Sequence, residues 1–306
     1  MKKPNYISPG KFSTTFFDEI LRSKEFDDIY FSSENGQKES DHVFISGNHL
    51  KEIMPNSKNF IIGELGFGTG LNFLLTWKLF KELKIKDGYL DYISIEGYPL
   101  MKNQMNKVHE KHPNLQKLWV ELQDALPPLW SGIHRLNLNH GKVRLTLIYN
   151  DVLEALKNSI FKADAWFLDG FSPNKNHDMW SLEVMSEIYR LTKPSGTFST
   201  FSSAGFVRRN LEKAGFDVKK IKGYNFKKEM SCGQKPGMEK SKEKFSKIVI
   251  VGGGVAGASI ASSLRKRGYD PIVIEKNNKL AQGSSGNLAA VQHPRLTTVN
   301  TPNGRL

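Results

Sequence analysis

The chain has 306 residues, with 44 Lys and Arg against 31 Asp and Glu, which gives a formal net charge of +13. Its hydrophobic fraction of 39%, with 19 Phe and 5 Trp, is enough for a packed core and excludes a globally disordered chain. The single cysteine, Cys232, excludes an intrachain disulfide and a multi-cysteine zinc site, and no metal site is predicted. No apolar run approaches the ~20 residues of a membrane helix, and the first residues lack the apolar stretch of a signal peptide. These features predict a soluble, cytoplasmic protein of one or two domains, and the positive excess favours a polyanionic partner.

Two short segments near the start are predicted to be strands, and they could pair as a hairpin. They are FDDIYFS (residues 26–32) and DHVFISG (residues 41–47). From residue 59 onward, predicted strands alternate with predicted helices. The strands are residues 59–65, 90–99, 142–151, 163–171, 196–202 and 216–224, and the helical segments are 66–83, 101–112, 152–160, 179–192 and 204–215. Because the strands are largely apolar, they imply a parallel sheet covered on both faces. The prediction is a doubly wound α/β domain.

The alternation stops near Gln234. Residues 236–246 are rich in Lys and Glu and poor in apolar side chains, which predicts a flexible basic linker. A second strand–turn–helix–strand unit then begins at residue 247, and the chain ends about 60 residues later. The predicted organisation is therefore an α/β domain over residues 1–235, the linker, and a truncated dinucleotide-binding segment over residues 247–306.

A glycine cluster separates the first strand of the alternation from its helix. Glu64 is followed by Gly66, Gly68 and Gly70. Glycines at this place let the backbone approach a ligand closely and turn tightly into the helix. The spacing differs from the dinucleotide fingerprint G-x-G-x-x-G. It resembles motif I of S-adenosylmethionine-dependent methyltransferases, and the alternative is a tight turn without a ligand.

Carboxylates stand at the ends of the following strands, and in open α/β sheets ligands bind beyond the carboxyl ends of the strands. Glu96 resembles the residue that binds ribose hydroxyls in class I methyltransferases, although it could be a solvated strand end. Asp151 resembles the residue that contacts the adenine amino group, and it could also cap the helix that starts at Val152. Asp169, in LDGFSP, is placed to receive an amine or a flipped base, and the alternative is a turn-forming residue.

Several longer motifs carry a more specific resemblance. GELGFGTGLNF, WFLDGFSPNKNHDMW, TFSSAGFVRRNLEKAGF and KKEMSCG, in this order, resemble the methyltransferase half of the bifunctional tRNA 5-methylaminomethyl-2-thiouridine biosynthesis family. FDDIYFSSENG and HVFISGNHL extend the resemblance over nearly all of residues 12–234. The resemblance implies a class I, Rossmann-like methyltransferase fold and S-adenosylmethionine as cofactor. It also implies methylation of an aminomethyl nitrogen on the wobble uridine of tRNA, after an FAD-dependent half has removed a carboxymethyl group.

Residues 205–228 form a basic segment with eight Lys or Arg against two acidic residues, interleaved with aromatic side chains. Basic side chains neutralise phosphates and aromatic rings stack on unpaired bases, which suits an anticodon loop. Arg208, Arg209, Lys227 and Lys228 are the predicted RNA contacts. The alternative is an ordinary solvated helix face.

The second unit carries its own glycine motif. Gly252, Gly254 and Gly257 fit G-x-G-x-x-G between a strand and a helix, and Glu275 ends the next strand. This arrangement predicts the pyrophosphate turn and ribose carboxylate of an FAD site. GSSGNLAAVQHPRL resembles the next stretch of the family's FAD-binding half, but the rest of that half does not follow. The prediction is an incomplete site with weak or absent FAD binding.

The sequence thus predicts a tRNA-modifying methyltransferase in which Asp169 lies next to the amine. Two alternatives stay open: a non-catalytic tRNA-binding remnant, and an FAD-dependent oxidoreductase completed by a separate chain. His109, His112 and His177 lack metal-ligand spacing and are predicted to be solvated.

Overall fold

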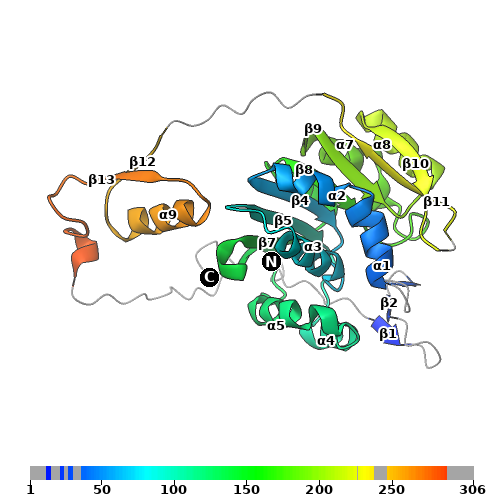
Figure 1. The fold of residues 1–306 in the computed structure, drawn as a ribbon, viewed down its shortest axis with the longest axis horizontal. Helices are drawn as coiled ribbons and strands as arrows, with labels where there is room; N and C mark the ends of the chain where they lie inside the picture. Colours follow the sequence, from blue (N-terminus) through cyan, green and yellow to red (C-terminus); the bar gives the residue numbers. More distant parts are fainter. Residues whose placement is uncertain are drawn as a thin grey trace, which may run out of the picture. The chain divides into compact units, whose positions relative to one another are not determined.

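The computed structural model describes residues 12–14, 21–23, 27–29, 36–225, 227–237 and 247–287 (Figure 1). These residues fall into two compact units, one within residues 5–240 and one within residues 241–306. Most of the predicted linker, from residue 238 to residue 246, lies outside the described residues. Within the described ranges, no helix is both long and apolar enough to cross a membrane.

The larger unit is built on a mainly parallel sheet. In the described residues its strands follow the spatial order β10-β11-β9-β8-β4-β5-β7-β6. Their bounds are β4 (Asn59–Leu65), β5 (Tyr89–Glu96), β6 (Gly132–Leu138), β7 (Val143–Tyr149), β8 (Ala163–Leu168), β9 (Thr192–Thr200), β10 (Asp217–Lys222) and β11 (Glu229–Gln234). β4 pairs in parallel with both β5 and β8. The order of the strands reverses at β4, so the crevice beyond its carboxyl end is the expected ligand position.

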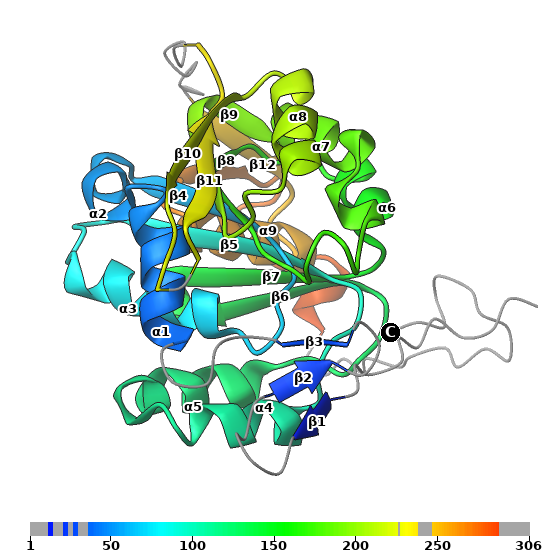
Figure 2. The same ribbon diagram turned by 90° about the vertical axis from the view of Figure 1, so that its right-hand side faces the viewer.

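Helices cover both faces of this sheet, as the alternation predicts. Figure 2 shows α1 to α3 on one face and α6 to α8 on the other. The bounds are α1 (Gly36–Ser40), α2 (Leu50–Ile53), α3 (Leu71–Glu82), α4 (Lys102–His109), α5 (Gln116–Ala125), α6 (Val152–Lys157), α7 (Leu182–Arg190) and α8 (Gly205–Ala214). Short 3-10 turns stand at Met54–Asn56, Pro113–Leu115, Asn139–Gly141 and Asp178–Trp180.

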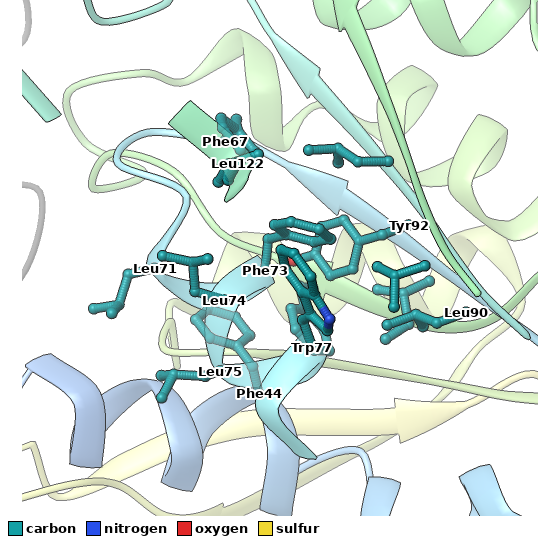
Figure 3. Packing of buried hydrophobic residues seen from close by; sticks show 14 of the residues in the cluster. Phe44, Phe67, Leu71, Phe73, Leu74, Leu75, Trp77, Leu90, Tyr92 and Leu122 are labelled. Atoms are coloured by element: carbon teal, nitrogen blue, oxygen red, sulfur yellow. The ribbon is translucent and has the colours of Figure 1, made fainter. Parts of the chain in front are cut away.

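A buried cluster lies on each face of the sheet, because side chains alternate along each strand. On β8, Phe167 belongs to the cluster under α3 and Trp166 to the cluster under α6, α7 and α8. In the first cluster the ring of Phe73 meets Tyr92 edge-on, with centroids 5.1 Å apart, and contacts Trp77 at 5.7 Å (Figure 3). Burying one such side chain stabilises the fold by about 1.5–3 kcal/mol. This packing holds α3, and the turn before it, against the sheet.

The prediction of a strand over residues 41–47 is wrong. Asp41–Ser46 instead form a π-helix that continues from α1. Val43, Phe44 and Ile45 are consecutive and all buried. In a strand, successive side chains point to opposite faces, so such a run would need cover on both sides. The helical turn instead packs on the sheet, where Phe44 stacks on Phe167 with ring centroids 5.2 Å apart.

Three short strands near the start pair antiparallel in the order β1-β2-β3. They are β1 (Phe12–Thr14), β2 (Leu21–Ser23) and β3 (Asp28–Ile29), and β3 is the described part of the first predicted strand. The Asp28 carboxylate accepts a hydrogen bond of 2.7 Å from the backbone N–H of Ser172. This bond ties the start of the chain to the loop that follows β8.

The smaller unit has the predicted strand–helix–strand order. β12 (Ile248–Val251) and β13 (Pro271–Ile274) pair in parallel, and α9 (Val255–Lys266) connects them. The Val251 side chain at the end of β12 is 86% exposed. The described part of this unit therefore has little apolar cover over its strands.

Candidate cofactor and catalytic site

A cavity of about 770 Å³ opens beyond the carboxyl ends of β4, β5, β7 and β8. A volume in this range is typical of small-molecule sites. Its lining includes the predicted cofactor-binding and catalytic residues Gly66, Gly68, Glu96, Asp151 and Asp169. Residues that are up to about a hundred positions apart in the chain thus meet at one edge of the sheet, because parallel strands end there together.

The glycine turn forms one wall of this cavity. Gly66, Gly68 and Gly70 have φ angles of +79°, +51° and +77°, values that favour glycine over residues with a side chain. Gly70 does not line the cavity but precedes the first residue of α3. A Cβ atom on Gly70 would lie 2.9 Å from the ring of Phe67. The glycines therefore let the chain turn sharply and bring its backbone to the cavity.

Glu96, at the end of β5, is bound to the glycine turn. Its Oε2 accepts a hydrogen bond of 2.9 Å from the backbone N–H of Gly68, and its Oε1 accepts one of 2.7 Å from Tyr98. Burial raises the pKa of the Glu96 carboxyl, and the hydrogen bonds from Gly68 and Tyr98 oppose that rise. Backbone N–H groups thus hold the Glu96 carboxylate at the edge of the cavity that it lines.

Asp151 is the N-cap of a helix, which is one of its two predicted roles. Its Oδ1 accepts hydrogen bonds of 3.0 Å from Leu153 N and 3.1 Å from Glu154 N, which makes it the N-cap of α6. The same residue lines the cavity. The cap orients the carboxylate, since the first helical amides hold one of its oxygens.

Asp169, directly after β8, is half-buried in the cavity wall. Its Oδ1 accepts a hydrogen bond of 2.8 Å from Gly170 N, and its Oδ2 accepts one of 2.8 Å from Asn72 Nδ2. Burial raises the pKa of the Asp169 carboxyl to about 6, although these two hydrogen bonds favour the ionised form. At neutral pH the group is therefore mainly ionised and able to accept a proton.

Glu64 lies behind the cavity rather than in its lining. The residue is fully buried, and its Oε2 accepts a hydrogen bond of 2.7 Å from Ser94 Oγ. Its Oε1 accepts a hydrogen bond of 3.1 Å from Asn72 Nδ2. Burial raises the pKa of the Glu64 carboxyl to about 8. Its described polar contacts are thus with neighbouring side chains. Asn72, which does line the cavity, was missed by the sequence analysis.

The predicted RNA-contacting residues lie in two places. Arg208 and Arg209 are on α8, and Arg209 is exposed. Lys227 and Lys228 are exposed residues that come just before β11. Lys227 also lines the cavity, where its Nζ lies 2.9 Å from Glu39 Oε1 and 4.6 Å from the centre of the Phe201 ring. One of the four residues therefore stands at the cavity itself.

The prediction that His109 is solvated is wrong. His109 is fully buried and stacks on Trp119, with ring centroids 4.2 Å apart. Its Nε2 lies 2.7 Å from the carbonyl oxygen of Thr69, so Nε2 carries the hydrogen and donates. Burial lowers the pKa of His109 to about 4, which keeps the ring neutral at pH 7. His109 thus supports the glycine turn, whereas His177 is exposed as predicted.

The smaller unit has a second glycine turn. Gly252 has a φ of +103°, and a Cβ atom on Gly257 would lie 1.9 Å from the carbonyl oxygen of Gly252. Glu275 Oε2 accepts a hydrogen bond of 2.7 Å from Gly253 N. This bond is the main reason that the pKa of Glu275 is lowered. Gly254 is the N-cap of α9. The predicted residues therefore meet at the carboxyl ends of β12 and β13, next to the start of α9.

Comparison with known proteins finds a matching family model in each unit. Residues 113–236 match the family model of an S-adenosyl-L-methionine-dependent methyltransferase, and residues 247–304 match that of an FAD-dependent oxidoreductase. The chain is 38% identical over 309 aligned residues to the tRNA 5-methylaminomethyl-2-thiouridine biosynthesis bifunctional protein MnmC of Marinomonas sp., covering 94% of this chain and 46% of the relative. It is 39% identical to MnmC of Aliivibrio fischeri, covering 90% of this chain and 44% of the relative.

The chain is therefore similar to part of the MnmC proteins, and its two units match family models of a methyltransferase and of an FAD-dependent oxidoreductase. It spans about half the length of the MnmC relatives that it matches. The resemblance that the sequence motifs indicate is therefore confirmed.

A solved structure agrees with the fold of the larger unit. The crystal structure of MNMC2 from Aquifex aeolicus superimposes with a TM-score of 0.56 at 23% identity, covering 76% of this chain and 73% of that chain. At this identity the match shows a common fold. The predicted fold class of the larger unit is therefore confirmed, and residues 113–236 within it match a methyltransferase family model.

Proposed function

We propose that the larger unit methylates the aminomethyl nitrogen of 5-aminomethyl-(2-thio)uridine at the wobble position of tRNA, with S-adenosylmethionine as the methyl donor. The observation that carries the proposal is the shared cavity. A carboxylate suited to an amine, that of Asp169, lines the same cavity as the glycine turn and Glu96. The similarity to MnmC proteins over nearly the whole chain supports the choice of a tRNA substrate.

The cavity fits the proposed cofactor. The glycine turn would bring its backbone against the amino-acid part of S-adenosylmethionine, since Gly66 and Gly68 line the cavity with positive φ angles. Glu96 would accept hydrogen bonds from the ribose hydroxyls, and Asp151 would contact the adenine amino group. Gly70 would shape the turn, and Glu64 would act from behind it through Asn72.

Asp169 is the proposed catalytic residue. S-adenosylmethionine supplies an activated methyl group when it is bound, so the protein mainly has to align the amine and exclude water. The attacking nitrogen must be unprotonated, and after it gains the methyl group it must lose a proton. The Asp169 carboxylate can accept a hydrogen bond from the amine, orient its lone pair and take up that proton. A wobble base lies in a single-stranded loop, so presenting it needs no opening of a duplex.

The proposal is tested by incubating the purified chain with S-adenosylmethionine and tRNA that carries the 5-aminomethyl group. Nucleoside mass spectrometry is expected to show the methylaminomethyl product. Unmodified tRNA is the control and should gain nothing. If the chain binds both S-adenosylmethionine and tRNA but yields no product, it is the alternative, a tRNA-binding protein without catalysis.

Charge removal at the exposed Arg209 of α8 is expected to weaken tRNA binding. Arg209→Ala should lower affinity for all tRNAs alike and reduce the slope of log K against log salt by about one, because one phosphate contact is lost. Lys86→Ala is the matched control, since Lys86 is an exposed cation just before the amino end of β5, at the edge opposite the cavity. Binding curves over a range of salt that superimpose for Arg209→Ala and the parent would remove this residue from the RNA surface.

For the smaller unit we expect no oxidase activity by this chain alone, and FAD binding that is weak or absent. Gly252, Gly254, Gly257 and Glu275 can form the pyrophosphate turn and a ribose contact, but the described sheet of this unit has two strands, and a two-stranded sheet is marginal by itself. Flavin absorbance of the purified chain should be well below one equivalent, and limited proteolysis should cut first in residues 236–246, leaving the domain of residues 1–235. Stoichiometric flavin, or loss of the carboxymethyl group from tRNA without a second chain, contradicts this expectation. If oxidase activity appears only with a separate chain that supplies the remainder of the FAD-dependent half, that chain is a partner.

A further inference from the structure

A row of hydrogen-bonded polar side chains leads from Asp169 into the core of the larger unit. Asn72 Nδ2 donates to Asp169 Oδ2 at 2.8 Å and to Glu64 Oε1 at 3.1 Å. Ser94 Oγ donates to the other oxygen of Glu64 at 2.7 Å. One amide group therefore holds two carboxyl groups that come from the ends of two neighbouring strands, β4 and β8.

The orientation of the Asn72 amide is set by its partners. The two acceptors on its Nδ2 side are carboxyl oxygens, which need N–H donors. On the other side, the hydroxyl of Ser40 donates to Asn72 Oδ1. Both hydrogens of the amide are thus directed at carboxyl groups, and its oxygen is occupied. A rotation of the amide by half a turn would put its oxygen against two carboxyl oxygens, which is unfavourable.

Asn72 is a buried polar residue among apolar neighbours. Asn72 is the second residue of α3, a helix in which the neighbours Leu71, Phe73 and Leu74 are buried apolar side chains. Asn72 is itself only 9% exposed. A buried amide costs free energy unless its hydrogen bonds are made. An apolar residue at this position would pack as well with its neighbours but would leave the Asp169 carboxylate with one hydrogen bond fewer.

We propose that Asn72 is a positioning residue for Asp169, which holds the carboxylate toward the cavity and stabilises its ionised form. Asn72 stands two residues after Gly70, the last glycine of the turn. Its side chain therefore also connects α3 to Asp169, the residue proposed to bind the amine. The proposal rests on the function proposed above for Asp169. Glu64 supports Asn72 from the core side, which gives this buried carboxyl group a role outside direct cofactor contact.

Other charged or titratable groups also act on Asp169, and they come from several elements. The charges that act on Asp169 directly are Lys227 before β11 and Glu39 on α1, while Asp169 in turn raises the pKa of Glu64 on β4 and of Tyr92 on β5. Further ionisable residues that line the same cavity are Asp28, Glu96, Tyr98, Asp151, Lys175, His177 and Asp178. Among the groups named, Glu64 is bonded to Asn72 and loses that hydrogen bond in Asn72→Ala, which favours its neutral form and adds no charge near Asp169. A change in the titration of Asp169 then reports the lost amide.

The test is Asn72→Ala, read out by NMR titration of the Asp169 carboxyl carbon in the protein without cofactor. The signal is assigned by its disappearance in Asp169→Asn. A donor to a carboxylate lowers its pKa, so its removal should raise the pKa of Asp169 above about 6, by roughly one pH unit. The acid limb of the kcat profile for tRNA methylation should move to higher pH by the same amount. At neutral pH kcat should fall about 10-fold, as expected for one hydrogen bond to a charged group.

Thr76→Val is the matched control, because Thr76 is buried one turn further along α3 and its hydroxyl donates to the backbone carbonyl of Asn72, so this variant removes a hydrogen bond to Asn72 without changing its side-chain amide. It should leave the titration of Asp169 unchanged. An Asn72→Ala protein that folds and shows the parent titration of Asp169 overturns the proposal.

If Asn72→Ala does not fold, Ser40→Ala is the deciding variant. Loss of the hydroxyl that orients the amide should raise the pKa of Asp169 in the same direction, and an unchanged pKa again overturns the proposal. Failure of the parent to methylate tRNA would instead reject the proposed function, which the NMR titration does not depend on.

Discussion

Replacement of Asp169 by alanine is expected to lower kcat for tRNA methylation by about 100- to 10,000-fold, the usual contribution of a positioned general base. The affinity for S-adenosylmethionine should stay near that of the parent, because Asp169 is assigned to the amine and Glu96 and the glycine turn to the cofactor. The carboxylate lies in the cavity wall and accepts hydrogen bonds from Gly170 and Asn72. Single-turnover kinetics, together with calorimetric titration of the cofactor, separate the two effects.

The pH dependence of this reaction follows from the same group. Burial raises the pKa of Asp169 to about 6, so the carboxyl group gains its charge as the pH rises through that value. Only the ionised form accepts a proton, and the methylation rate should therefore fall as the pH is lowered below about 6. Asp169→Asn is the control for shape, since it keeps the volume of the side chain and removes its charge. Equal rates for the parent and Asp169→Ala would exclude a role for this carboxylate.

The second large effect is expected for Gly68→Val, which should lower the affinity for S-adenosylmethionine by about 100-fold or more. Gly68 has a φ of +51°, which a β-branched residue adopts only with strain. It also lines the cavity and donates its N–H to Glu96, so a side chain there would both fill the site and disturb the proposed ribose contact. Isothermal titration calorimetry measures the loss, about 2.7 kcal/mol for 100-fold.

Gly141→Val is the control that separates backbone strain at a positive φ angle from filling of the cofactor cavity by a side chain. Gly141 has a φ of +82°, and a Cβ atom there would meet nothing within 4 Å. It lies in the turn before β7, at the opposite edge of the sheet from the cavity. This variant should lose stability but bind S-adenosylmethionine as the parent does. Parent-like cofactor affinity in a folded Gly68→Val protein would place the cofactor elsewhere.

Most of the α/β order could be predicted because its signals are local. The buried strands β4, β5, β7 and β8 are short apolar runs between turn signals, and such runs favour central parallel strands whatever their neighbours are. The glycine turn is equally local, since positive φ angles at Gly66 and Gly70 leave few other residues possible. The carboxylates at the strand ends follow from the same pattern, because parallel strands end at one edge.

Two strands of the large sheet were missed because their pairing depends on distant partners. β11 contains Ser231, Cys232 and Gly233, which have little intrinsic preference for a strand, yet it pairs antiparallel with both β9 and β10. β6 is an edge strand whose residues are mostly exposed, so its sequence carries almost no alternating pattern. In both cases the partner strand decides the conformation, and β-propensity is context-dependent for this reason.

The sequence by itself determined the class of the fold, the two glycine turns and which carboxylates end the central strands, because these depend on contacts between near neighbours in the chain. Only the tertiary structure decided what those carboxylates touch. It placed Glu64 behind the cavity and buried His109 beneath the glycine turn. It also brought Asn72 against Asp169, 97 positions away in the chain. The physical reason is that a polar side chain is held by whichever partners the packed sheet and helices bring within about 3 Å, and sequence spacing does not specify those partners.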